Sequence, residues 1–220
     1  MSLPFTAQEF LDVFRRYNQS VWPAQAILVV LALVAIVAAL SGGRRASRLV
    51  SFILGLLWLW SGAAYHLSFF REINPIAAVF GIAFIGQAVL VVWLGVVRQS
   101  LNFDVRSGWS AIVGASIIAY SLIAYPLIGL GLGHRLPSAP TFGVPCPTAI
   151  FTFGLIVWLT APRPRSIVII PALWSVVAFF ASIELGMWED LGLTAAALAG
   201  IAATFWPLRK PPLVTRPLVA

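Results

Sequence analysis

The chain has 220 residues, of which 60% are hydrophobic and 10% are charged, and its formal net charge is +7. Soluble globular proteins carry about 25% charged residues, so this composition, with a mean hydropathy of +0.96, excludes an ordinary soluble domain. The basic residues form short clusters between apolar segments and no continuous polar face. We therefore expect a lipid bilayer as the partner and no nucleic acid.

Residues 1–23 predict a short amphipathic helix on the outer membrane surface. Thr6 is the expected N-cap, Glu9 completes a capping box three residues later, and Phe5 pairs with Phe10 as a hydrophobic staple. Such a helix serves either as an interfacial anchor or as a lid over an outer cavity. Trp22 then marks the turn into the first apolar segment.

Apolar segments fill residues 24–206 and predict an all-α, polytopic transmembrane helix bundle. A span needs about 20 residues, so the chain is expected to have about seven spans. The predicted spans are 24–40, 49–70, 76–97, 111–131, 144–160, 167–187 and 191–206. The fifth and seventh give the weakest signals, because the strictly apolar part of the fifth begins only after Pro147. Six spans remain an alternative, and residues 207–220, with four prolines, are predicted to form a flexible cytoplasmic tail.

The orientation follows from the loop charges, because Lys and Arg are retained on the cytoplasmic side. One predicted side holds Arg44, Arg45, Arg48, Arg98, Arg106, Arg163, Arg165, Arg209, Lys210 and Arg216. The other holds Arg15, Arg16, Arg71 and Arg135, with every acid except Asp104: Glu9, Asp12, Glu72, Glu184, Glu189 and Asp190. This asymmetry predicts an outer N-terminus and a cytoplasmic C-terminus.

Polar side chains inside the predicted spans are the candidate ligand or proton contacts, because each is costly in lipid unless it is paired or lines a wet cavity. These candidates are His66, Glu184, Gln87, Tyr120 and Tyr65. Glu184 is expected to be either protonated or paired with His66, Arg71 or Arg135. His66 is equally compatible with a structural hydrogen bond.

A metal site is a further hypothesis. It would use His66, His134, Cys146 and Glu184 if the second, fourth, fifth and sixth spans converge at the outer side. No local spacing of the zinc-binding type links these residues. Cys146 is the only cysteine, so an intramolecular disulfide is excluded.

Four parts of the sequence carry a resemblance: the segment from Pro140 to Leu155 with its Pro145-Cys146-Pro147 core, the opening Leu3-Pro4-Phe5-Thr6, the stretch Tyr65-His66 to Asn74-Pro75, and the pair Glu189-Asp190. Together they resemble a family of uncharacterised bacterial multi-pass membrane proteins. The resemblance covers nearly the whole chain and implies a bacterial inner-membrane location. Permease labels are sometimes attached to such proteins. The resemblance implies no catalytic residue.

Three functions remain open. The first is a small permease or channel with an outer polar vestibule for an ion or small solute, and it predicts a polar path that continues inward. The second is a metal- or cofactor-binding protein or accessory subunit, whose outer pocket is closed below by Trp58, Trp60 and other apolar side chains. The third is a structural partner without its own ligand. No enzyme activity is predicted, no cofactor is required, a transition metal is compatible with the second function, and the oligomeric state is left open.

Overall fold

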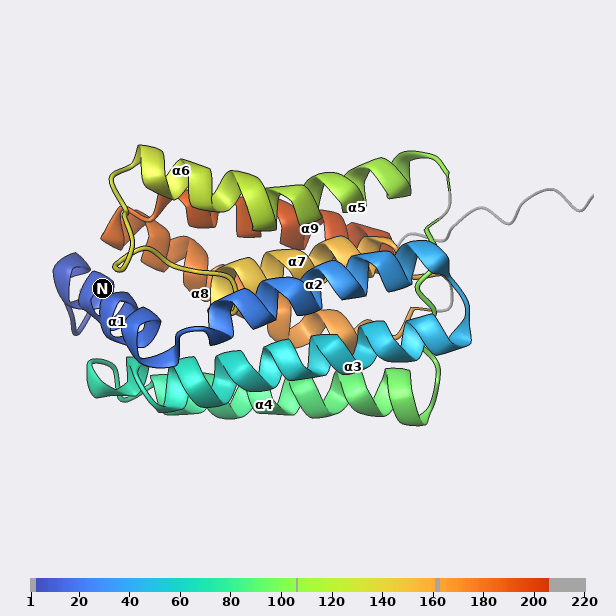
Figure 1. Ribbon diagram of the computed structural model, residues 1–220, viewed down its shortest axis with the longest axis horizontal. Helices are drawn as coiled ribbons and strands as arrows, with labels where there is room; N and C mark the ends of the chain where they lie inside the picture. The colour runs from blue at the N-terminus through green and yellow to red at the C-terminus, as the bar shows by residue number, and fades with distance from the viewer. Residues whose placement is uncertain (1–2, 106, 161–162, 206–220) are drawn as a thin grey trace, which may run out of the picture.

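The computed structural model describes residues 3–105, 107–160 and 163–205. Arg106, Trp206, Arg209, Lys210 and Arg216 lie outside the described residues, as does the predicted tail. The described chain is built from helices that run side by side along the longest axis of the molecule (Figure 1). This arrangement confirms the predicted all-α bundle.

The helices follow one another in the order of the predicted spans. Some are extended by π-helical turns, named η1, η3 and η4, and short 3₁₀ turns form η2, η5 and η6. Their bounds are α1 Ala7–Val21, α2 Ala24–Ser41, α3 Arg44–Trp60, η1 Ser61–Leu67, η2 Phe70–Glu72, α4 Ala77–Val92, η3 Trp93–Val97, α5 Trp109–Ala119, η4 Tyr120–Ala124, α6 Tyr125–Gly131, α7 Pro145–Val157, η5 Arg165–Val168, α8 Ile169–Leu185, η6 Trp188–Asp190 and α9 Leu191–Phe205.

Five helical segments are long and apolar enough to cross a membrane: Ala24–Ser41, Arg44–Glu72, Ala77–Val97, Trp109–Gly131 and Arg165–Leu185. They coincide with the first, second, third, fourth and sixth predicted spans. The two segments with the weakest sequence signals are shorter: α7 has 13 residues and α9 has 15 described residues. The structure therefore contains several helices that are able to cross a membrane.

Helix α7 is short because it lies inside the bundle. All of its residues except Cys146 are buried, and it packs against α5, α8 and α9. At 1.5 Å per residue it is about 20 Å long, less than the ~30 Å of a bilayer core. A helix surrounded by other helices does not have to match the lipid thickness, because its ends are covered by protein.

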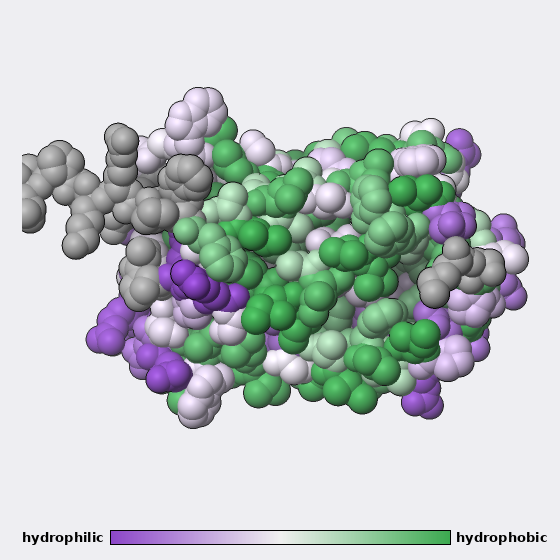
Figure 2. Space-filling view, turned by 180° about the vertical axis from the view of Figure 1, so that it is seen from behind, coloured by the Kyte–Doolittle hydropathy of each residue, from purple (hydrophilic) through white to green (hydrophobic). Residues whose placement is uncertain are grey.

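The turns divide between two ends of the bundle, which we name the α1 end and the far end. The α1 end carries α1 and the turns 68–76, 132–144 and 186–190, and the far end carries the turn 42–43 and the described residues 98–105, 107–108, 158–160 and 163–164 (Figure 1). Between the ends, Figure 2 shows a hydrophobic band flanked by hydrophilic residues. Such a band is the surface expected of a protein surrounded by lipid.

Helix α1 covers one end of the bundle, and its N-terminus has the geometry predicted from the sequence. The backbone N–H of Glu9 donates to Thr6 Oγ1 at 3.2 Å, and the Thr6 N–H donates to Glu9 Oε2 at 2.7 Å. The rings of Phe5 and Phe10 stack at 5.8 Å. Further along, Trp60 Nε1 donates to the Tyr17 hydroxyl at 2.7 Å, which fastens α1 to the second membrane-capable segment.

Glycine permits the close approach of η1 to α4. A Cβ atom added at Gly62 would lie 2.8 Å from the carbonyl oxygen of Gly81 and 3.0 Å from Phe84 Cβ. Small residues at such crossings let helix backbones approach where lipid provides no hydrophobic drive. A Cβ at Gly86, in the same helix α4, would meet nothing within 4 Å.

We predict that Gly62→Ala destabilises the protein by about 1–3 kcal/mol, because the added methyl group overpacks against backbone that cannot move freely. Gly86→Ala is the matched control and should be neutral or slightly stabilising, since alanine favours a helix over glycine. Thermal unfolding of the purified protein in detergent measures both. Equal melting temperatures for the two variants would contradict the close contact between η1 and α4.

Candidate functional site

The most polar part of the buried interior lies at the α1 end, in the turn η6 between α8 and α9. Glu189 is fully buried there and Asp190 is 6% exposed. The turn is held by the bonds Met187 N to Ser182 O at 3.0 Å and Asp190 N to Met187 O at 3.0 Å. Burying carboxylates is costly unless each is partnered, so the groups around them define a candidate site.

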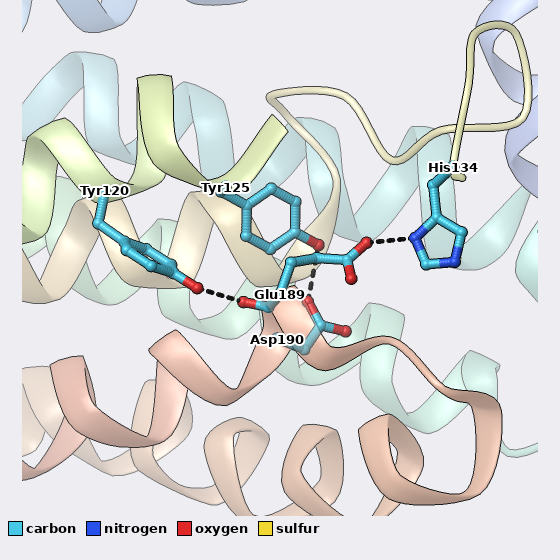
Figure 3. A network of polar contacts seen from close by, with 5 residues as sticks. All are labelled: Tyr120, Tyr125, His134, Glu189 and Asp190. Atoms are coloured by element: carbon cyan, nitrogen blue, oxygen red, sulfur yellow. Dashed lines mark hydrogen bonds and ion pairs between the residues drawn. The ribbon is translucent and has the colours of Figure 1, made fainter. Parts of the chain in front are cut away.

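Glu189 connects the turn to the loop after α6. Its Oε1 atom lies 2.7 Å from His134 Nδ1, and its backbone oxygen accepts a hydrogen bond from the Tyr120 hydroxyl at 2.8 Å. In Figure 3, Tyr120 contacts Glu189 from the left and His134 contacts it from the right. The second carboxylate oxygen, Oε2, is buried without a partner among the described residues, so this group retains a free acceptor.

Asp190 points toward α6 and α7. Its Oδ1 atom accepts a hydrogen bond from the Tyr125 hydroxyl at 2.7 Å (Figure 3), and the Cys146 thiol also hydrogen-bonds the carboxyl group. Burial raises the pKa of Asp190 from 3.8 to about 7, and the nearby charge of Glu189 adds to the rise, whereas the bond from Tyr125 opposes it. With a pKa of about 7, both the protonated and the ionised form of this carboxyl group are present near neutral pH.

A cavity of about 70 Å³ lies beside Asp190 and Cys146. It is enclosed on one side by Phe10 and Phe14 of α1 and by Phe5 just before it, so α1 acts as its lid. The remaining wall is largely apolar and includes the aromatic side chains of Tyr65, Phe70, Phe80 and Trp174. The buried Tyr65 hydroxyl has no partner among the described residues, which leaves it available to an occupant of the cavity.

His66 does not form the polar contact expected from the sequence. It is fully buried in η1, and its ring meets Phe84 at 4.7 Å and Trp174 at 5.2 Å between centroids. Neither ring nitrogen has a partner among the described residues. The prediction of a structural hydrogen bond is therefore wrong, because the side chain sits among aromatic rings behind the cavity wall.

Glu184 is exposed on the surface of α8, so it does not lie among the buried polar groups of the bundle. Ala178, Ser182 and Leu185 form the buried face of this helix at spacings of four and three residues. A residue two positions after Ser182 points away from that face. The buried carboxylates are Glu189 and Asp190 instead.

Gln87 and Tyr120 have separate surroundings. Gln87 is fully buried, and its Nε2 donates to the Ile167 carbonyl at 2.9 Å, which joins α4 to η5. Tyr120 belongs to the α1-end network through its bond to Glu189. The four predicted metal ligands, His66, His134, Cys146 and Glu184, do not converge: in the part of the chain that the structure describes, no three His, Cys, Asp or Glu residues form a metal-binding group.

Sequence reasoning missed the roles of Glu189, Asp190 and Tyr125, which it placed in a turn or left unremarked. The available signal was the shortness of the turn between two apolar segments. Acids confined to so few residues between helices have little room to reach water and need partners from neighbouring elements. Their long-range partners, Tyr125 and His134, lie more than 50 positions earlier in the chain, a pairing that no local pattern reveals.

We predict that Asp190 makes stability depend on pH. Between pH about 4 and about 7 the folded protein retains a proton that the unfolded chain has lost, so the free energy of unfolding falls as pH rises and levels off above pH 7. The free energy of unfolding of the unsubstituted protein should fall by roughly 2–4 kcal/mol over this range, and Asp190→Asn should remove this fall. Melting temperatures measured from pH 4 to pH 8 test this; the exposed, ion-paired Asp12 provides the control Asp12→Asn. An unchanged pH slope in Asp190→Asn contradicts the prediction.

Comparison with known proteins gives a family assignment without an activity. No curated protein and no solved structure matches the chain. The sequence model of a family of unknown function (DUF6064) matches residues 7–213, which is nearly the whole chain. This agrees with the resemblance to an uncharacterised family noted from the sequence. The chain belongs to this family of unknown function.

Proposed function

We propose that the protein is a multi-pass integral membrane protein with its α1 end outside and its far end in the cytoplasm. The charges support this orientation. The far end carries Arg44, Arg45, Arg48, Arg98, Arg163 and Arg165 among the described residues, whereas the acids other than Asp104 lie at the α1 end. Cytoplasmic loops retain basic residues. The resemblance to bacterial membrane proteins favours an inner-membrane location.

Seven crossings agree with the order of the turns. Successive turns alternate between the α1 end and the far end along the chain (Figure 1). In this proposal α7 counts as a span although it is short, because surrounding helices shield it from lipid. Residues 1–23 lie along the outer surface, and α1 serves as the lid of the cavity.

We further propose that the protein binds a small organic cation in the cavity beneath α1. The observation that carries this proposal is the combination of a buried carboxyl group, Asp190, with the aromatic rings that line the same cavity. A cation attracts both an ionised carboxylate and the faces of aromatic rings. Binding would hold Asp190 in its ionised form, whereas an anion would meet repulsion from Asp190 and Glu189.

The geometry favours retention of a ligand over passage through the bundle. A permease needs a polar path that continues toward the far end. In the middle of the bundle, the buried Trp58 donates to Thr152 Oγ1 at 2.9 Å, and Gln87 donates to the Ile167 carbonyl. Both polar side chains are used in joining helices, and Trp58 packs on Phe84 with centroids 4.5 Å apart. These contacts support a pocket closed below, as the second function expected, with an organic cation in place of a metal.

Methylammonium and acetate form a matched probe pair, because both are small enough for the cavity, share a methyl group and carry opposite charges. We predict that methylammonium raises the melting temperature of the purified protein in a saturable way and that acetate does not. A ligand that binds only the folded state at ten times its Kd stabilises it by about 1.4 kcal/mol. Ala181 lines the cavity, so Ala181→Phe should abolish the shift by filling the space.

Ala119 is exposed on α5, and Ala119→Phe provides the matched control that should retain the methylammonium shift. Equal shifts in the two variants would assign the effect to detergent or to the surface and contradict the cavity. The proposal would also fail if neither compound changed the melting temperature of the unsubstituted protein.

A further inference from the structure

A second hollow lies on the flank of the bundle, between α2 and the continuous segment α5–α6. We name it the lateral groove. Its volume is about 830 Å³, and its walls come from residues 25–29 of α2 and residues 121–130 of α5–α6, with the loop 136–142 as its roof. Tyr125 lines both the lateral groove and the cavity beneath α1, so the two spaces share one residue in their walls.

The loop that roofs the lateral groove is held in place by one buried side chain. Asn18 Nδ2 donates to the carbonyl oxygens of Pro137 at 2.6 Å and Ala139 at 2.8 Å, and its Oδ1 accepts from Thr141 Oγ1 at 2.8 Å. Proline further restricts the loop backbone. The roof is therefore pre-formed, and the groove does not depend on an occupant to keep its shape.

Polarity changes along the groove. Asn18, Gln25 and His134 line its part nearest the α1 end, whereas Ala26, Val29, Leu122 and Leu127 are among the apolar residues of its walls. Gln25 is 8% exposed, and its Oε1 atom has no partner among the described residues. An occupant with a polar end and an apolar chain matches this order of side chains.

The groove opens on the lipid-facing belt. Ile27 and Val30 of α2 and Leu127 and Leu130 of α6 are exposed apolar residues beside it. From Ser121 to Leu130 the wall of the groove extends for about 13 Å at 1.5 Å per residue, less than the ~15 Å of hydrocarbon in one leaflet. Its depth therefore suits a chain that enters from one leaflet.

We propose that the lateral groove binds an acyl chain of an outer-leaflet phospholipid. This inference rests on the proposed membrane orientation and is independent of the ligand in the cavity beneath α1. The lipid's polar part lies at the level of Gln25 and His134, and its chain runs between α2 and α6. Because Tyr125 forms part of both walls, the chain packs against the residue that donates to Asp190.

The test uses nanodiscs of phosphatidylcholine in which a fraction of the lipid carries a diazirine on one acyl chain. After irradiation, mass spectrometry of peptides locates the crosslinks. We expect them to concentrate in residues 22–29 and 121–136. Ala26→Trp should reduce labelling of these segments about tenfold, because the indole would obstruct the groove beside α2. A tenfold loss corresponds to about 1.4 kcal/mol of binding free energy.

Ala195 is exposed on α9, so Ala195→Trp is the matched control and should leave the labelling pattern unchanged. Leu130→Trp, on the opposite wall of the groove, provides a second blocking variant, and thermal unfolding confirms that each variant is folded. Even labelling along the whole apolar belt that neither blocking variant changes overturns the lipid site. A protein that acquires no crosslink in any segment contradicts insertion into the bilayer itself.

Discussion

The burial of two adjacent carboxyl groups in the turn between α8 and α9 constrains the whole α1 end. Glu189 and Asp190 lie where little water reaches them, and an unpartnered carboxylate in such a place costs several kcal/mol. Their partners come from other elements: His134 from the loop after α6 and Tyr125 from α6 itself. These bonds place α6 and its loop against the start of α9.

The partner of Asp190 also connects two spaces. The Tyr125 hydroxyl donates a hydrogen bond to Asp190, and Tyr125 lines both the lidded cavity and the lateral groove. Asn18 holds the roof of the groove while the neighbouring Tyr17 accepts a bond from Trp60. Helix α1 thus closes the cavity and shapes the groove at once, which explains why a surface helix carries so many buried side chains.

Periodicity, composition and capping signals predicted the helices well, because each is a local property of the chain. The capping box at Thr6 and the apolar segments needed no knowledge of distant residues. The site was predicted poorly. His66 and Glu184 attracted interest as polar residues in apolar segments, but the direction of a side chain depends on which helix face is covered by neighbours.

The pairing of Asp190 with Tyr125 links residues 65 positions apart, and only the packing of α6 against the turn brings them together. Likewise, the burial of α7 follows from the arrangement of its neighbours and not from its own short apolar run. Local sequence therefore revealed which segments are apolar enough to cross a membrane, whereas tertiary contacts decided which polar groups meet.

The proposed positions of the cavity and the lateral groove both require that the α1 end faces outward. Ser20 and Ser41 are exposed and lie in the last turn of α1 and at the last residue of α2, so a cysteine at each reports one end of the bundle. In a Cys146→Ala background, a membrane-impermeant maleimide added to intact cells should label Ser20→Cys, and Ser41→Cys only after the membrane is permeabilised. Labelling of Ser41→Cys in intact cells, with Ser20→Cys protected, would contradict the proposed orientation and place the cavity on the cytoplasmic side.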